Sequence, residues 1–178
     1  MPTISTSASR LKYRCDPKKL DPREKLEALI NFLVEKYVGG EPFFDRLDAT
    51  VRSPEFVDTL FKMVGNDDIV VSGKFGAFFR DNYRPAGLLL CVNGGLRIGA
   101  ACDSLLPYEK ALRGRTFSFV DDTYYSGSTR RAIEAALAEV GAKLDKCYIV
   151  YDGSKIPDPT VISLYRYWDH WDGKNRIK

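Results

Sequence analysis

One segment constrains the fold of this chain more than any other, because it joins an apolar run, two acids and a turn of small residues. The apolar run 117–120 leads directly into Asp121 and Asp122, and the small residues 126–129 follow after a short spacer. From Ser128 onward the apolar residues recur at helical spacing. A strand that passes through such a turn into a helix is typical of α/β proteins, in which ligands bind at the carboxyl ends of parallel strands.

The rest of the chain agrees with a parallel sheet, since short apolar runs alternate with helical patterns from residue 87 to residue 151. We expect helices over 21–38, 53–64, 96–112 (interrupted near Pro107) and 128–140, and strands over 69–72, 87–92, 116–120 and 147–151. The segment 73–85 fits either a hairpin or a short helix, and the residues from 152 on are irregular and aromatic. Strand 87–92 is apolar throughout, as in a strand buried on both faces.

These elements predict an α/β fold with a parallel, Rossmann-like core, helices before it and a small C-terminal hood or tail. With 178 residues, the chain suits a single domain over 21–178, preceded by an N-terminal arm over 1–20. The first fifteen residues contain no acid and are rich in Ser and Thr, which fits a frayed arm or an organelle transit peptide. No stretch approaches the ~20 apolar residues of a membrane helix.

Charge and cysteine content exclude some classes of function. The net charge is 27 − 24 = +3, which is too weak to argue for nucleic acid as a partner. The four cysteines have no CxxC spacing and His170 is the only histidine, which argues against a zinc cluster. Cys91 and Cys147 lie inside apolar runs, so we expect buried, reduced thiols and a cytoplasmic protein.

The segment after strand 116–120 has the chemistry of a sugar-phosphate site. Asp121 and Asp122 can accept hydrogen bonds from vicinal sugar hydroxyls or help to hold a hydrated Mg²⁺. Gly127 lets the backbone approach a ligand closely. Because the turn 126–129 runs into a helix, its N–H groups and hydroxyls favour a phosphate. Together the two halves predict a site for a ribose 5-phosphate.

The segment Phe117-Ser118-Phe119-Val120-Asp121-Asp122-Thr123-Tyr124-Tyr125-Ser126-Gly127-Ser128-Thr129 resembles the phosphoribosyl pyrophosphate (PRPP) motif of type I phosphoribosyltransferases. That motif has four apolar residues, two acids, three variable residues, Thr or Ser, Gly, any residue and Thr. The resemblance implies that the two acids act on the ribose hydroxyls and Mg²⁺ and that the later residues surround the 5′-phosphate. The implied PRPP-binding residues are Asp121, Asp122, Thr123, Tyr124, Tyr125, Ser126, Gly127, Ser128 and Thr129.

The same resemblance implies an enzyme of nucleotide salvage that transfers ribose 5-phosphate from PRPP to a nucleobase-like acceptor and releases pyrophosphate, with Mg²⁺ as cofactor. It also implies a homodimer. In 6-oxopurine enzymes of the family an acid precedes the Thr/Ser-Gly step, whereas this chain has Tyr125. The alternative is a regulatory protein that binds PRPP or a nucleotide without catalysis and that could also bind RNA. The short spacing before Asp121 and the absence of an obvious lid favour a protein without catalysis.

Two segments could bind the pyrophosphate. The first is the Asn-Gly-Gly turn after strand 87–92, which makes a compact strand–helix–strand unit but lies only 26 residues before Asp121. With this loop, which we favour, Lys74, Arg80 and Arg84 are the nearby basic groups. The pyrophosphate-binding residues in this interpretation are Asn93, Gly94, Gly95, Lys74 and Arg80.

The second segment is Ser72-Gly73-Lys74-Phe75-Gly76, after strand 69–72. Its spacing to Asp121 is closer to that of the family, and Lys74 could contact pyrophosphate. The aromatic tail 165–171 is a further open question: it could stack an acceptor base, or it could pack as a C-terminal plug or dimer contact.

Overall fold

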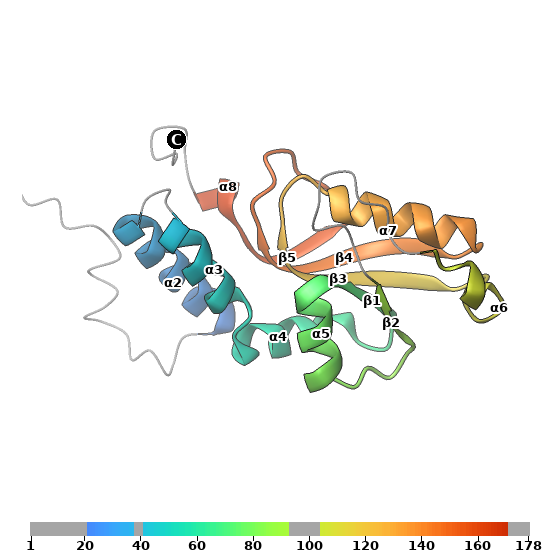
Figure 1. Cartoon of the computed structure of the whole chain (residues 1–178). Coiled ribbons are helices and arrows are strands. Elements are labelled where there is room, and N and C mark those ends of the chain that lie inside the picture. The colour runs from blue at the N-terminus through green and yellow to red at the C-terminus, as the bar shows by residue number, and fades with distance from the viewer. Residues whose placement is uncertain (1–20, 38–40, 93–103, 171–178) are drawn as a thin grey trace, which may run out of the picture.

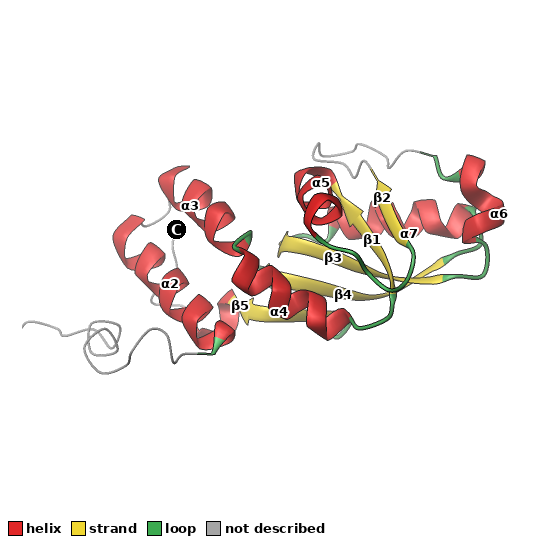
Figure 2. Ribbon diagram, turned by 90° about the horizontal axis from the view of Figure 1, so that it is seen from below, coloured by secondary structure: helices red, strands yellow, loops and turns green. Residues whose placement is uncertain are grey.

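A parallel sheet forms the centre of the structure, a computed structural model that describes residues 21–37, 41–92 and 104–170. Its strands are β1 (Asp68–Ser72), β2 (Leu89–Val92), β3 (Thr116–Tyr124), β4 (Lys143–Asp152) and β5 (Val161–Arg166). They lie in the order β2-β1-β3-β4-β5, and every neighbouring pair is parallel. Figure 2 shows the twist of this sheet and the helices beside it. The predicted α/β fold with a parallel core is confirmed.

Helices cover both faces of the sheet (Figure 1). Those described are α2 (Pro22–Tyr37), α3 (Glu41–Val51), α4 (Pro54–Val64), α5 (Gly73–Asn82), the 3₁₀ turn η2 (Leu106–Tyr108), α6 (Glu109–Leu112), α7 (Ser128–Glu139) and α8 (Tyr167–His170). The helices α2 to α5 share one hydrophobic cluster, whereas α6 and α7 share another. Side chains alternate between these faces along β1: Ile69 and Val71 belong to the first cluster and Val70 to the second.

Helix α2 forms where the sequence provides a cap and an apolar stripe. The side chain of Asp21 accepts hydrogen bonds from the backbone N–H groups of Arg23 and Glu24 at 2.8 and 3.1 Å, as expected of an N-cap. Helix α3 was not predicted from the sequence, although Phe43, Leu47 and Val51 are buried at four-residue steps. It leads into α4 through a turn at residues 52–53.

Two expectations about the sheet were wrong. Strand 87–92, expected to be buried on both faces, is the edge strand β2, and its Cys91 is exposed, whereas Cys147 in β4 is buried. The chain after residue 152, expected to be irregular, contains β5 and α8. An apolar run alone does not distinguish an edge strand from a central one, because strand order is set by the whole topology.

The ambiguous segment 73–85 forms α5, so the helical alternative is the correct one. The expected break near Pro107 coincides with η2, but residues 96–103 of the predicted helix lie outside the described residues, as does the predicted arm over 1–20. Within the described ranges, no helix has both the length and the apolar character needed to cross a membrane.

Candidate functional site

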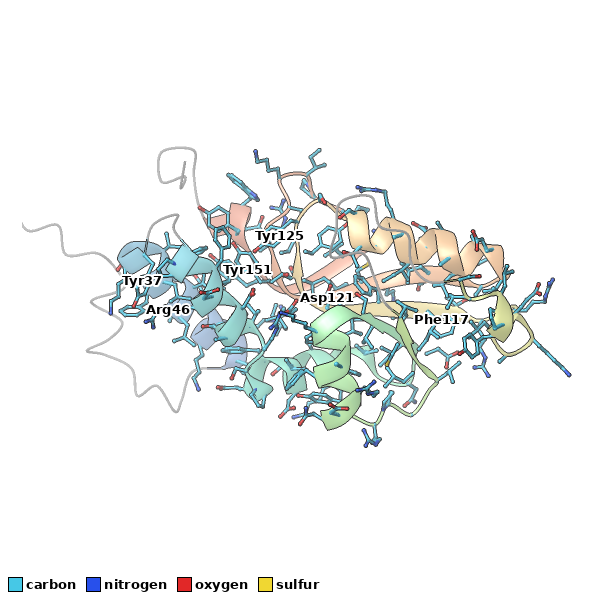
Figure 3. The ribbon with its side chains drawn as sticks, in the orientation of Figure 1. Tyr37, Arg46, Phe117, Asp121, Tyr125 and Tyr151 are labelled. Atoms are coloured by element: carbon cyan, nitrogen blue, oxygen red, sulfur yellow. The ribbon has the colours of Figure 1, made fainter. Side chains whose placement is uncertain are left out.

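A cavity of about 370 Å³ opens at the carboxyl ends of β1 and β3. Four parts of the chain meet there: the C-terminal end of α3, the β1–α5 junction, the end of β3, and the turn into α7. Figure 3 labels Asp121 in this region, with Tyr125 and Tyr151 beyond it. The lining residues are Asp48, Arg52, Ser72, Gly73, Lys74, Phe75, Phe119, Asp121, Asp122, Thr123, Tyr124, Tyr125, Ser126, Gly127, Ser128, Thr129 and Arg130.

The two acids lie inside β3 rather than beyond its end. The strand continues to Tyr124, and Asp121 is in register with Ile149 of β4. Because side chains alternate along a strand, Asp122 follows Val120 toward the face covered by α2 to α5, and Asp121 follows Phe119 toward the other face. Both residues nevertheless line the same cavity at this end of the strand.

Asp122 forms an ion pair with Arg52, which lies one residue beyond the end of α3. The Nε atom of Arg52 donates to Oδ2 of Asp122 at 2.6 Å, and the exposed fractions of the two side chains are 36% and 7%. Asp48 lines the cavity one helical turn before Arg52. A helix from the N-terminal part of the chain thus supplies an acid and a base to this site.

Asp121 carries the strongest electrostatic perturbation among these acids. Burial raises the pKa of its carboxyl well above the ordinary value, and the negative charge of Asp122 raises it further. Its Oδ1 atom accepts the backbone N–H of Asp122 at 2.9 Å. Burial also raises the pKa of Asp48, while the positive charges of Arg52 and Lys74 act in the opposite direction. Several acids thus share a partly desolvated space, and a cation placed among them would stabilise their ionised forms.

The turn after β3 has the geometry of an anion site. Gly127 is the N-cap of the 12-residue helix α7 and has φ +74°, so its backbone is left-handed. A Cβ atom at this position would lie 2.6 Å from the hydroxyl oxygen of Tyr124. The N-cap residue itself makes no side-chain hydrogen bond to the helix, although the N–H of Ser128 donates to Oγ of Ser126 at 3.4 Å. The other N–H groups of the first turn and the hydroxyls of Ser126 and Ser128 can donate to a phosphate.

Arg130, in the first turn of α7, forms an ion pair with the loop between β4 and β5. Its Nη1 atom donates to Oδ2 of Asp158 at 2.5 Å, and Asp158 also accepts hydrogen bonds from the hydroxyl of Thr160 at 2.7 Å and that of Tyr124 at 3.5 Å. The side chain of Arg130 is only 12% exposed. These contacts attach the β4–β5 loop to the start of α7.

The junction of β1 and α5 brings Ser72, Gly73 and Lys74 to the cavity. Gly73 has φ +61°, which lets the chain turn from the strand directly into the helix. Ser72 is buried, while Lys74 is exposed. This segment is one of the two alternatives for a pyrophosphate loop, and it faces the acids of β3 from the neighbouring strand.

The other alternative, Asn93, Gly94 and Gly95, lies outside the described residues. Arg80, grouped with it in the sequence interpretation, is on α5 and pairs with Asp81 at 3.1 Å. It is not among the described residues that line the cavity. Of the basic groups proposed from the sequence, Lys74 is therefore the one that the fold brings to the acids.

The aromatic tail packs largely as a plug. Tyr165 and Tyr167 are buried, and the ring of Tyr165 stacks on Tyr151 with centroids 5.6 Å apart. The indole nitrogen of Trp168 donates to the carbonyl of Gly153 at 3.1 Å. The aromatic side chain that remains exposed at the cavity is instead Tyr125. The side chain of His170 and all of Trp171 lie outside the described residues.

Tyr125 lies against Gly153 at the end of β4. A Cβ atom on Gly153 would lie 2.7 Å from the Tyr125 ring, so only glycine permits this close approach. Burial raises the pKa of Tyr125 to about 12, so its hydroxyl stays protonated at neutral pH. At the position where 6-oxopurine enzymes have an acid, this chain therefore presents a neutral phenol.

Sequence reasoning missed Asp48, Arg52 and Arg130 as lining residues. Asp48 and Arg52 belong to a helix that was not predicted, and nothing in their own sequence spacing distinguishes them from an ordinary solvent-exposed i, i+4 pair. Arg130 directly follows the motif, so proximity to Thr129 is the one signal that could have identified it.

Comparisons with known proteins give fold-level likenesses only. No protein-family model and no curated protein matches the sequence. One similar solved structure is an adenine phosphoribosyltransferase from Thermoanaerobacter pseudethanolicus, with 18% identity and a TM-score of 0.46 over 67% of this chain and 86% of that one. Another is a hypothetical protein from Neisseria gonorrhoeae with bound ppGpp, with 16% identity and a TM-score of 0.45 over 62% of this chain and 76% of that one. A purine phosphoribosyltransferase from Pyrococcus horikoshii is also similar, with 12% identity and a TM-score of 0.42 over 62% of this chain and 82% of that one. At these identities, function must be argued from this chain's own residues.

Proposed function

We propose that this chain, whose fold resembles that of the type I phosphoribosyltransferases, transfers ribose 5-phosphate from PRPP to a nitrogen nucleophile of the nucleobase type. One observation carries the proposal: a single cavity joins paired acids on β3, the N-terminus of α7 and the lysine-bearing turn after β1. The acids suit a sugar, the N-terminus of α7 suits one phosphate, and the turn after β1 suits a second phosphate group. PRPP carries a ribose between two such phosphate groups.

These three groups support one orientation of the substrate. The 5′-phosphate binds the first turn of α7, where helix N–H groups and the hydroxyls of 126–129 converge. The ribose hydroxyls bind the carboxylates of Asp121 and Asp122. The pyrophosphate then extends toward Ser72, Gly73 and Lys74, which follow the adjacent strand β1. We thus assign the pyrophosphate loop to this turn on the strength of the residues described.

In the reaction, a nitrogen of the acceptor forms a bond to C1′ of the ribose while the bond from C1′ to the pyrophosphate oxygen breaks, and the proton that this nitrogen carried leaves to water or to the released pyrophosphate. The bonding electrons leave with pyrophosphate, and positive charge develops on the ribose ring. Asp121 and Asp122 orient the ring and stabilise that charge, and Lys74 binds the leaving group. Tyr125 offers the acceptor an aromatic surface rather than an acid or base, because its phenol stays protonated.

The acids fit a magnesium site of the kind that substrate phosphates complete. Mg²⁺ in proteins is often held by one or two carboxylates together with phosphates and water. Burial and mutual repulsion raise the pKa of Asp121, and a divalent cation beside it would relieve that repulsion. Asp121 and Asp122 would hold the metal, which supplies neutralisation of the pyrophosphate charge when bound.

Calorimetric titration of PRPP in the presence of Mg²⁺ tests the binding site. The Asp121→Asn/Asp122→Asn double variant should lose binding while remaining folded. Asp145→Asn is the control, since Asp145 is exposed on β4 and does not line the cavity. Unchanged affinity in the double variant would refute the assignment of the acids.

Release of pyrophosphate, measured with a panel of purine, pyrimidine and nicotinate-like acceptors, tests the reaction. Release that depends on one acceptor identifies the substrate and establishes the transferase. Binding of PRPP without release for any acceptor favours the regulatory alternative.

We also propose, from the family resemblance, that the protein is a cytoplasmic homodimer that acts in nucleotide salvage. Light scattering measures its oligomeric state.

A further inference from the structure

The charges that line the cavity are balanced before any phosphate enters. Among the described lining residues, the acids are Asp48, Asp121 and Asp122, and the bases are Arg52, Lys74 and Arg130. Arg130 is bound to Asp158 beneath the turn, and Arg52 is bound to Asp122. A substrate with a 5′-phosphate and a pyrophosphate adds several negative charges, and a cation that exchanged its protein partner for a phosphate would help to neutralise them.

Arg52 is better placed for such an exchange than Arg130. Its side chain is 36% exposed and is held by one ion pair, whereas that of Arg130 is 12% exposed. Arg52 also lies just beyond the last residue of α3, where its long side chain enters the cavity from outside the sheet. Releasing a guanidinium that is 36% exposed costs less free energy than uncovering one that is 12% exposed, and the ribose hydroxyls would take over the buried carboxylate of Asp122.

The partner of Arg52 is the acid assigned to the ribose. Carbons C1′ and C2′ of the ribose are bonded to each other, so a pyrophosphate on C1′ lies beside the hydroxyl on C2′. The guanidinium of Arg52 lies within hydrogen-bond distance of Asp122, the acid assigned to the ribose. A change of its side-chain rotamer would therefore bring it to the pyrophosphate. The planar guanidinium of arginine can also donate two parallel hydrogen bonds to a pair of phosphate oxygens.

We propose that Arg52 is an exchangeable cation of this site: it pairs with Asp122 until the ribose occupies that carboxylate, and it then turns to the pyrophosphate of PRPP. The inference rests on the proposed function and adds to it a phosphate-binding residue from α3, outside the motif. Arg52 and Lys74 hold the pyrophosphate from two parts of the chain, the residue after α3 and the turn after β1. Arg52 has two effects, since it competes with the ribose for Asp122 and attracts the pyrophosphate.

Three ligands separate these two effects in calorimetry: PRPP, pyrophosphate and ribose 5-phosphate, each with Mg²⁺. Arg52→Ala should weaken the binding of PRPP and pyrophosphate by about tenfold or more, the loss expected for one charge-assisted hydrogen bond. It should leave ribose 5-phosphate binding unchanged or tighter, because the competitor for Asp122 is gone. Arg52→Lys should retain part of the PRPP affinity, since it keeps the charge but not the planar fork.

Arg46→Ala is the matched control. Arg46 is also on α3, but it packs over the ring of Tyr37 at 4.6 Å, away from Asp121 (Figure 3). It should leave all three affinities unchanged. Thermal unfolding of each variant shows whether the fold is retained.

Each result decides between distinct explanations. Equal weakening of ribose 5-phosphate and PRPP by Arg52→Ala would mean that Arg52 only supports the fold of the site, and tighter PRPP binding would mean that it only competes. Either outcome, or no change, overturns the inference while the proposed function stands. If the unaltered chain does not bind PRPP, the proposed function fails and this inference fails with it.

Discussion

Substituting the two adjacent acids singly by asparagine should have unequal effects on stability, although both changes remove one negative charge. Asp121→Asn removes a partly buried carboxylate whose pKa is raised by desolvation and by the charge of Asp122, and the amide can still accept the N–H of Asp122. Asp122→Asn relieves the same repulsion between the acids, but it also removes the charged partner of Arg52. We expect Asp121→Asn to be the more stable variant.

The size of the difference follows from the Arg52–Asp122 hydrogen bond, because the relieved repulsion is common to both variants. A hydrogen bond to a charged group contributes about 1.5–3 kcal/mol and a neutral one about 0.5–1.5 kcal/mol. Replacing the carboxylate by an amide should therefore cost about 1–1.5 kcal/mol of unfolding free energy. For a domain of this size, Asp121→Asn should melt about 2–6 °C above Asp122→Asn.

The pH dependence gives an independent check on the raised pKa of Asp121. A carboxyl with a raised folded-state pKa costs stability fully above that pKa; the cost declines as the pH falls through it and is gone below the unfolded-state pKa. The stabilisation by Asp121→Asn, relative to the unaltered chain, should thus be largest at neutral pH and shrink at mildly acidic pH.

Thermal unfolding by circular dichroism, with a chelator present to exclude divalent cations, measures both effects. Equal melting temperatures for the two single variants would refute the ion pair as a source of stability. A stabilisation by Asp121→Asn that grew as the pH fell would refute the electrostatic account of Asp121.

Three further changes test other parts of the site. Gly127→Ala places a side chain at φ +74° and against the hydroxyl of Tyr124, so we expect a loss of about 1–2 kcal/mol in denaturant unfolding, together with weaker phosphate binding. Gly153→Ala should displace the ring of Tyr125, reducing acceptor-dependent pyrophosphate release while PRPP affinity is kept; loss of both would show that Gly153 supports the whole cavity. The thiol of Cys147 is buried and its pKa is raised to about 12, so alkylation followed by mass spectrometry should modify it only after unfolding, and rapid modification of the folded chain would contradict that burial.

Much of the site could be predicted from the sequence because it is contiguous. The strand, the acids, the glycine turn and the helix 128–140 follow one another directly, and each is recorded by local features: apolar residues, carboxylates, small residues and helical periodicity. The structure has the same order of elements, with α7 at Ser128–Glu139. The predicted roles of these residues stay predictions until ligand binding is measured.

The position of the edge strand and the contribution of α3 could not be predicted in this way. The apolar run 87–92 has the composition of a central strand, yet the sheet places it beside β1 alone. The pairing of Arg52 with Asp122 joins residues 70 positions apart, and no local pattern encodes such a contact. Nor does composition decide whether Tyr165 stacks a ligand or packs against Tyr151.

By itself, then, the sequence determined which chemical groups stand at the acid pair and at the turn into α7, since those groups are adjacent in the chain and their backbone geometry is local. Only the tertiary structure decided which cations meet them. The parallel pairing of β1 with β3 brings Lys74 to the acids, and the packing of α3 against the sheet brings Arg52. The physical reason is that charges act over a few ångströms of space, whereas sequence patterns record only neighbours along the chain.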